Sequence, residues 1–338
     1  MTTSPLETVA PPRYAPKPKI DPRWVRLLWP LLSLVGLLLF DLLFVPGFFK
    51  VDTFAYILER ATPVLLLGVG MTLVIATGGV DLSVGSVMAI CAAVAANMVV
   101  AGQPAFLAFA AAMGLGLLAG MWNGALVAVL KIQPIVATLI LMVAARGIAQ
   151  LMTGGQPVTF SNAAYSFLGT GYVMRVPFGV VVAAVVLVAT ALAVRMTALG
   201  LFIEAVGGNA SASRYAGVNA TAVKWMVYVF SGACACVAGL VSAADTNTAD
   251  PNNLGRDMEL DAILAVVVGG TALTGGRFSL PGTVVGALVI QTLTTTLLMN
   301  NVAPERTLAV RAAVVIAVCL LQSDVVRAGF ARLRRPKT

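Results

Sequence analysis

The sequence predicts an all-α protein, a polytopic transmembrane helical bundle of about ten helices with broken or re-entrant Gly-rich segments. Hydrophobic residues make up 59% of the 338 residues. Charged residues make up only 11%, whereas soluble domains use about 25%. The mean hydropathy of +0.94 agrees with this composition. We therefore expect one integral membrane unit without a sizeable soluble domain.

The predicted spans follow from the length of the apolar runs, because a helix needs about 20 mostly apolar residues to cross a bilayer. Ten segments qualify: residues 25–45, 56–77, 84–101, 106–130, 134–153, 177–195, 224–244, 260–275, 279–300 and 307–324. They form a predicted transmembrane domain at residues 25–325, between a basic, Pro-rich tail at residues 1–24 and a basic tail at residues 326–338.

The Lys and Arg residues predict the orientation, since cytoplasmic segments of membrane proteins carry an excess of them. With the N-terminus inside, fifteen fall on inner segments and six on outer segments. The inner set comprises five at each terminus with Lys131, Arg195, Arg214, Lys224 and Arg277. We expect both termini in the cytoplasm, and we attribute the net charge of +8 to topology rather than to nucleic-acid binding.

Two Gly-rich stretches interrupt the apolar pattern, TGGVDLSVG at residues 77–85 and GGTALTGGR at residues 269–277. Each precedes a run of small and aliphatic residues. Broken helices at matching places in two halves are typical of transporters built from inverted repeats. Chance similarity between Gly-rich membrane segments explains the pair equally well, so the inverted repeat is only a possibility.

Glycines also recur at four-residue spacing within single predicted helices. Gly116, Gly120 and Gly124 share one face of the fourth helix, and Gly282 and Gly286 repeat the pattern on the ninth. Small residues at this spacing let another helix backbone approach closely. Packing inside the subunit and dimerisation are both compatible with such a face.

Asp81 is the single charged residue between Ala61 and Leu130. A charge near the bilayer centre costs about 2.5–3.5 kcal/mol on insertion scales, so it calls for a partner or a function. Asp81 could cap the helix that follows it, contact a substrate directly, or pair with Arg146 in the fifth apolar run. The sequence leaves these three interpretations open.

Catalytic chemistry finds no support in the sequence. The chain holds no His, which removes Ser–His triads and most zinc sites. The stretch at residues 269–277 lacks the Lys-Ser/Thr ending of a phosphate-binding loop. We expect no catalytic residue, no metal ligand and no cofactor on this chain.

Long motifs resemble the permease subunits of bacterial ABC sugar importers of the ribose, xylose and galactose kind. They are RATPVLLLGVGMTLVIATGGVDLSVGSVMAI at residues 60–90, EAVGGN at residues 204–209 and MELDAILAVVVGGTALTGGRFSLPGTVVGAL at residues 258–288. The stretch at residues 122–153, with LGLFIEAVG, is most similar to the galactofuranose-type permease.

The resemblance implies a location in the bacterial inner membrane and three protein partners. A second permease subunit, identical or different, would complete the pathway, and a periplasmic binding protein would deliver a monosaccharide. A cytoplasmic ABC ATPase would consume the ATP. Candidate substrate contacts are the polar residues placed in apolar helices, with one neighbouring aromatic: Asp81, Asn97, Trp122, Asn123, Gln150 and Asn300.

The inner segment at residues 196–223 is the expected contact with the ATPase. It is too polar at GGNASASRY to enter the bilayer, it is long for a connector, and it contains a plausible short helix around residues 210–216. The coupling candidates within it are Glu204, Gly207, Gly208, Asn209, Arg214 and Tyr215. The alternative from another class is an ion-coupled secondary transporter of a small polar solute, with Asp81 and Arg146 as a proton or ion relay.

Overall fold

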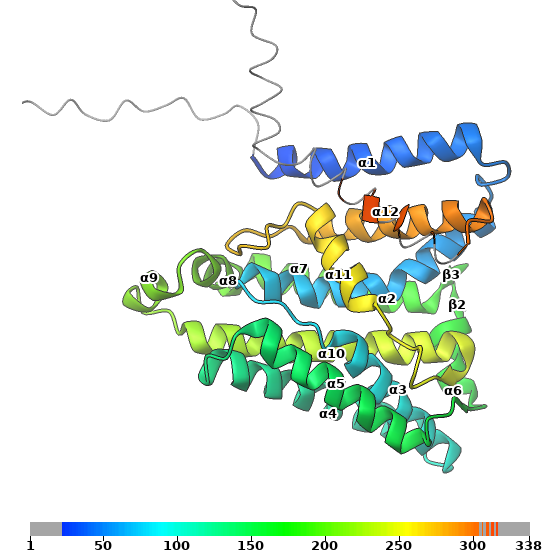
Figure 1. The fold of residues 1–338 in the computed structure, drawn as a ribbon, viewed down its shortest axis with the longest axis horizontal. Coiled ribbons are helices and arrows are strands. Elements are labelled where there is room, and N and C mark those ends of the chain that lie inside the picture. Colours follow the sequence, from blue (N-terminus) through cyan, green and yellow to red (C-terminus); the bar gives the residue numbers. More distant parts are fainter. Residues whose placement is uncertain (1–21, 304–305, 307–308, 311, 314–315, 317–338) are drawn as a thin grey trace, which may run out of the picture.

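The computed structural model of the chain describes residues 22–303 together with residues 306, 309, 310, 312, 313 and 316. This part of the chain is almost entirely helical, and its long helices run side by side (Figure 1). Seven of the described helices are long and apolar enough to cross a membrane. The prediction of a polytopic helical membrane protein is therefore confirmed.

The elements follow one another along the described chain in a simple order. The first part contains α1 (Pro22–Phe44), α2 (Val51–Ala76), α3 (Val84–Val100), α4 (Ala105–Gly124), a π-helical turn η1 (Ala125–Val129) and α5 (Pro134–Thr153). The middle contains β1 (Val158–Thr159), α6 (Ala163–Thr170), β2 (Tyr172–Val173), β3 (Val176–Pro177), α7 (Phe178–Met196), α8 (Leu199–Gly208) and α9 (Ala210–Tyr215). The last part contains α10 (Ala220–Thr246), β4 (Thr248–Ala249), α11 (Met258–Val268) and α12 (Leu280–Met299).

The predicted span at residues 260–275 is wrong in extent. The helix at this place, α11, has only 11 residues and ends at Val268. The following segment contains three glycines with positive φ, Gly270, Gly275 and Gly276, a conformation that interrupts a helix. The third predicted span, residues 84–101, matches α3 (Val84–Val100) to within one residue, although this helix of 17 residues is shorter than the roughly 20 residues that cross a bilayer. Most of the predicted span at residues 307–324 and of both predicted tails lies outside the described residues.

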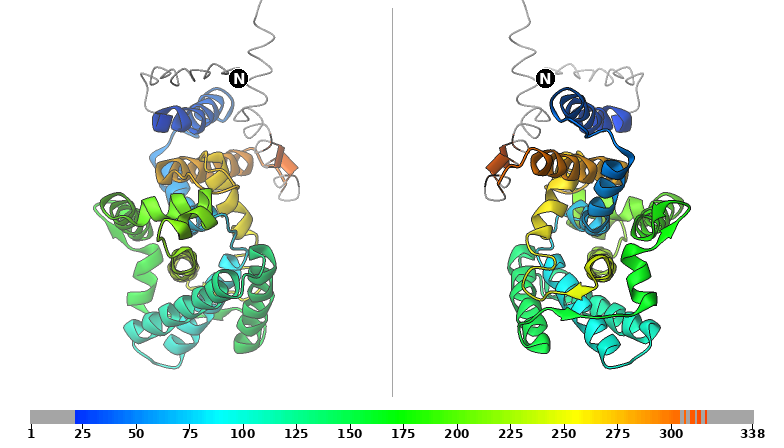
Figure 2. Two further views of the ribbon diagram at one scale, coloured as in Figure 1. Left: turned by 90° about the vertical axis from the view of Figure 1, so that its left-hand side faces the viewer. Right: turned by 90° about the vertical axis from the view of Figure 1, so that its right-hand side faces the viewer.

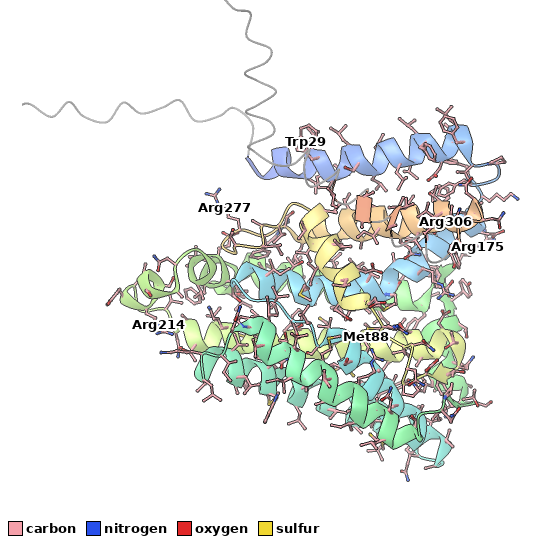
Figure 3. All side chains as sticks on the ribbon, viewed as in Figure 1. Trp29, Met88, Arg175, Arg214, Arg277 and Arg306 are labelled. Carbon is pink, nitrogen blue, oxygen red and sulfur yellow. The ribbon has the colours of Figure 1, made fainter. Side chains whose placement is uncertain are left out.

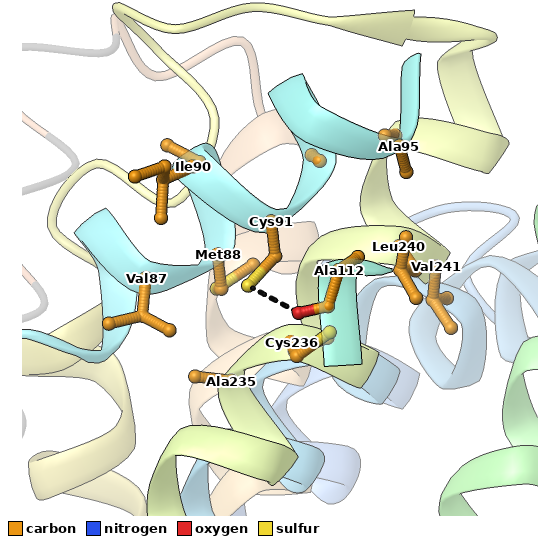
Figure 4. Close-up of a cluster of buried hydrophobic side chains, with 14 of the residues drawn as sticks. Val87, Met88, Ile90, Cys91, Ala95, Ala112, Ala235, Cys236, Leu240 and Val241 are labelled. Carbon is orange, nitrogen blue, oxygen red and sulfur yellow. Dashed lines mark hydrogen bonds between the residues drawn. The ribbon is translucent and has the colours of Figure 1, made fainter. Parts of the chain in front are cut away.

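The glycine face of α4 packs inside the subunit. A Cβ atom on Gly120 would come within 2.5 Å of the carbonyl oxygen of Tyr228 in α10, and one on Gly116 within 2.7 Å of the Cβ of Cys236. Small residues of α3 complete this contact, where the Cys91 thiol donates to the Ala112 carbonyl at 3.4 Å (Figure 4). The interpretation as subunit packing is confirmed at this face.

The second glycine pair has the same role between α12 and α11. A Cβ on Gly282 would meet the backbone of Gly269, and one on Gly286 would meet the backbone of Ala265. The helix α1 lies at the periphery against α12, as the end-on views show (Figure 2). There the Thr296 hydroxyl donates to the Asp41 carboxylate at 2.8 Å.

The two ends of the bundle differ in the segments they carry (Figure 1). One end, which we call the α8–α9 end, carries α8, α9 and the loop at residues 269–279. The opposite end, which we call the hairpin end, carries the β2–β3 hairpin and the loop at residues 247–257. Arg214 and Arg277 lie at the first end, Arg175 and Arg306 at the second (Figure 3). Basic residues that the sequence analysis assigns to opposite sides of the membrane thus lie at opposite ends of the helical bundle.

Candidate functional site

Asp81 lies in the non-helical segment between α2 and α3, and only 1% of it is exposed. The segment exists because Gly78 takes a positive φ directly after α2, which stops the helix. The Asp81 carboxylate then accepts a hydrogen bond from the Ser83 amide at 3.1 Å and another from the Ser83 hydroxyl at 2.6 Å. These two bonds hold the turn that leads into α3.

The same carboxylate also joins two other helices. Asn123 of α4 donates to Asp81 at 3.3 Å and to the Ser83 hydroxyl at 2.8 Å. Ser231 of α10 donates to the second carboxylate oxygen at 2.9 Å. Beside this cluster, the Tyr228 hydroxyl donates to the Val80 carbonyl at 3.3 Å. Asp81 therefore acts as a buried cross-link between the start of α3, α4 and α10. It bonds to the amide of Ser83, the residue before α3, and no side chain caps the first amides of that helix, so the interpretation of Asp81 as a helix cap is corrected to that of a turn-stabilising residue.

The remaining pathway candidates lie apart from Asp81. Asn97 donates to the Met152 carbonyl at 3.2 Å, and Asn300, which follows α12, donates to the Thr296 carbonyl at 2.8 Å. Gln150 donates to the Asn252 side chain at 2.8 Å. Trp122 is 55% exposed on the surface of the chain, although its neighbour Asn123 is buried. Of the six candidates, the structure brings only Asp81 and Asn123 together.

Arg146 is not brought to Asp81. Its guanidinium donates to the carbonyl oxygens of Pro251 at 3.0 Å and Leu254 at 2.7 Å. Within the described part of the chain, salt bridges join only Arg60 to Asp245 and Arg256 to Asp257. The ion-pair interpretation is corrected accordingly, because Arg146 lies in the half of α5 nearer the hairpin end and its donors are used on the loop there.

That loop is ordered by its own polar groups. The Asp250 carboxylate accepts hydrogen bonds from the amides of Asn252 and Asn253 and from the Asn253 side chain. Partial burial opposes ionisation of Asp250, but these hydrogen bonds outweigh it and lower its pKa from the ordinary value. The Asn252 side chain donates to the Gly155 carbonyl at 2.9 Å, so the loop is fixed to the chain after α5.

The predicted short helix at residues 210–216 is confirmed as α9, residues 210–215. The Asn209 side chain caps it by accepting from the Ala212 amide at 2.9 Å. Tyr215 is 95% exposed and Arg214 beside it is exposed. Glu204 is half-buried in α8, whose Leu201 is also exposed. The segment thus presents an aromatic, an aliphatic and a basic side chain at the α8–α9 end.

Three Gly-Gly pairs, Gly78-Gly79, Gly207-Gly208 and Gly275-Gly276, meet beneath this segment. The Gly276 amide donates to the carbonyl oxygen of Ala76, the last residue of α2, at 2.9 Å. A Cβ on Gly207 of α8 would overlap that carbonyl and come within 2.5 Å of the Gly276 amide nitrogen. A Cβ on Gly275 would come within 2.8 Å of the Gly78 amide nitrogen. The two Gly-rich breaks and the predicted coupling segment therefore share one junction.

The sequence analysis missed a group of side chains at the hairpin end. Glu59 and Arg60 of α2 and Ser242 and Asp245 of α10 line one cavity there. The only signal in the sequence is the placement of charged residues beside apolar runs, which does not show that they meet. Within the described residues, no group of three or more His, Cys, Asp or Glu side chains is arranged to hold a metal ion.

Known proteins match the chain over most of its length. It is 51% identical over 315 residues to a galactofuranose transporter permease protein of Escherichia coli (strain K12), covering 91% of this chain and 92% of that protein. It is 39% identical over 284 residues to a fructose import permease protein of Bifidobacterium longum (strain NCC 2705), covering 83% and 80%. A ribose import permease protein of Escherichia coli (strain K12) is 36% identical over 327 residues, covering 96% and 99%. No solved structure matches the chain.

The resemblance to sugar-importer permeases that the motifs suggest is confirmed by these relatives. A family model described as the permease component of branched-chain amino acid transport systems matches residues 53–319. The described helices are those of a multi-pass membrane protein. The chain therefore belongs to this family of membrane transport permeases.

Proposed function

We propose that the chain is the membrane-spanning subunit of an ABC importer that moves a monosaccharide across the bacterial inner membrane by alternating access. Galactofuranose or a galactose-like sugar is the favoured substrate. The support is the 51% identity to a galactofuranose transporter permease, together with the Trp122–Thr153 and α8 motifs that resemble it. Ribose and fructose permeases at 36% and 39% identity support the broader sugar class.

The observation that carries the proposal is that α8 packs directly against the two Gly-rich breaks, at Ala76 and at Gly276. The α8–α9 end faces the cytoplasm, in line with Lys131, Arg214 and Arg277 on the same side. A separate ABC ATPase docks on the exposed Arg214 and Tyr215, so ATP is bound by the partner and this chain carries no cofactor. Motion of α8 then reaches the end of α2 and the loop before α12 through direct backbone contact.

Two further partners complete the importer. A periplasmic binding protein delivers the sugar at the hairpin end. A second permease subunit, either a copy of this chain or a related one, packs beside the bundle within the bilayer. The exposed apolar side chains of α4 and α5, such as Leu118 and Val143, face lipid or that second subunit.

Reconstitution in proteoliposomes tests the proposal directly. The chain, its cognate ATPase and the binding protein are assayed for uptake of galactofuranose, galactose, ribose and fructose. We expect uptake that needs ATP and the binding protein and that is fastest with galactofuranose or galactose. Uptake by the permease alone under an ion gradient would instead establish the ion-coupled secondary transporter and refute the proposal.

A further inference from the structure

A cavity of about 460 Å³ lies at the hairpin end, between α2, α7, α10 and the loop that follows β4. Its volume falls within the range of small-molecule sites, roughly 300–1,000 Å³. None of the six pathway residues predicted from the sequence lines it. The cavity is therefore a separate candidate for contact with substrate.

Charged groups from two helices face one another in this cavity. The Arg60 guanidinium lies 3.8 Å from the Asp245 carboxylate and 5.4 Å from the centre of the Tyr56 ring. The carboxyl group of Glu59 lies beside that of Asp245. Carboxylates accept several hydrogen bonds at once, and a guanidinium offers up to five donors. The cavity thus supplies acceptors and donors within one small volume.

Ser242 provides a polar group that lacks a partner. Its hydroxyl oxygen is buried and makes no hydrogen bond in the structure. The neighbouring lining residue Thr62 differs, because its hydroxyl donates to the Leu58 carbonyl at 2.9 Å. A buried hydroxyl without a partner costs free energy, so a ligand or water that bonds to Ser242 is stabilised there.

The other lining residues are largely apolar and include Pro63, Val241 and Met258. We propose that this cavity is an entry site for a monosaccharide on the outer side of the permease, an inference that rests on the proposed function. Sugar hydroxyls donate to Glu59 and Asp245 and accept from Arg60 and Ser242, while the C–H face of the ring packs on the apolar wall.

The outer wall of the cavity is the loop that Arg146 holds. Its two hydrogen bonds to Pro251 and Leu254 fix this wall to α5, which gives the isolated charge of α5 a positioning role. The same loop reaches the start of α3, where Gly255 and Gly85 are in backbone contact. The wall of the cavity therefore contacts the chain at Gly85, four residues after Asp81.

Protection of an engineered cysteine tests the entry site on the permease alone. The native residues Cys91, Cys234, Cys236 and Cys319 are replaced by Ala, and Thr246→Cys, at an exposed lining position, reports on the cavity. Met174→Cys in the β2–β3 hairpin, 95% exposed and outside the cavity, is the control. Labelling with a charged thiosulfonate reagent is timed with increasing D-galactose, with D-ribose, and with glycine as a non-sugar solute.

We expect a sugar to slow labelling at Thr246→Cys about twofold when its concentration equals Kd, and to leave labelling at Met174→Cys unchanged. Adding Ser242→Leu, which fills the cavity, should remove the protection. Suppose that the wild-type permease imports sugar with its ATPase, but that Thr246→Cys is labelled at the same rate with and without either sugar. This result would overturn the entry site and leave the proposed function unaffected. Protection without ATP-driven uptake would support the entry site and overturn the function.

Discussion

Gly207 and Gly208 form a matched pair for testing how motion at α8 reaches the helix breaks. A Cβ on Gly207 would lie 2.5 Å from the Gly276 amide nitrogen and 2.9 Å from the Ala76 carbonyl carbon, below the 3.0 Å that real Cβ contacts keep. A Cβ on Gly208 would meet nothing within 4 Å. Neither residue has a positive φ, so alanine suits the backbone at both positions.

The expected cost of Gly207→Ala follows from these contacts. Forcing an extra methyl into a packed contact costs about 1–3 kcal/mol, and separating Gly276 from Ala76 removes a hydrogen bond that contributes about 0.5–1.5 kcal/mol. We therefore expect a loss of about 2–4 kcal/mol for Gly207→Ala. Gly208→Ala should be neutral, or stabilising by up to about 1 kcal/mol, through helix propensity alone.

Two measurements on the purified variants separate stability from coupling. Thermal unfolding in detergent reports the free-energy loss, and proteoliposomes with ATPase and binding protein report uptake and ATP hydrolysis. Gly207→Ala should insert in the membrane but transport less sugar per ATP than wild type. Gly208→Ala should match wild type in both assays. If the two variants behave alike, the contact of α8 with Ala76 does not carry the coupling.

Two further predictions use the same assays, and a third uses cysteine labelling. Asp81→Asn should fold and transport nearly normally, since the Ser231 hydroxyl can accept a hydrogen bond where it now donates one. Asp81→Leu should unfold at a lower temperature, since each buried donor left unpaired costs about 1–3 kcal/mol. Failure of transport in a well-folded Asp81→Asn variant would show that the charge itself is needed. Gly120→Ala should lower the thermal midpoint, while Gly114→Ala, whose Cβ would meet nothing within 4 Å, should not; equal midpoints would contradict tight α4–α10 packing. In a cysteine-free background, Arg214→Cys should be labelled only from the inside and Met174→Cys only from the outside, and the reverse pattern would invert the proposed orientation.

The helices were predictable from the sequence because the signals for them are local. Apolar runs of spanning length gave α1, α2, α4, α5, α7, α10 and α12, and the glycine spacing gave the close face of α4. The extent of α11 was not predictable in the same way. The predicted span continues past Val268, but the chain leaves the helix at Gly269, which packs against Gly282 of α12, and at Gly270, which has a positive φ.

The partners of the buried charges were not predictable, because they lie far away along the chain. Asp81 bonds to Asn123 and Ser231, which are 42 and 150 residues away. Arg146 bonds to carbonyl oxygens that are 105 and 108 residues away. The sequence shows that an intramembrane charge must be compensated, but any polar group could do so. Only the packing of helices decides which group does.

The junction of the three Gly-Gly pairs explains why separate Gly-rich motifs occur in one chain. At Gly207, Gly275 and Gly276 the backbones touch without side chains between them, so no flexible atoms can absorb a displacement. We therefore expect a movement of α8 to displace Ala76 and the loop before α12 together. Asp81 follows Ala76 by five residues and anchors α3, α4 and α10 at its other side. A short, rigid connection thus links the surface proposed for the ATPase to the polar centre of the bundle.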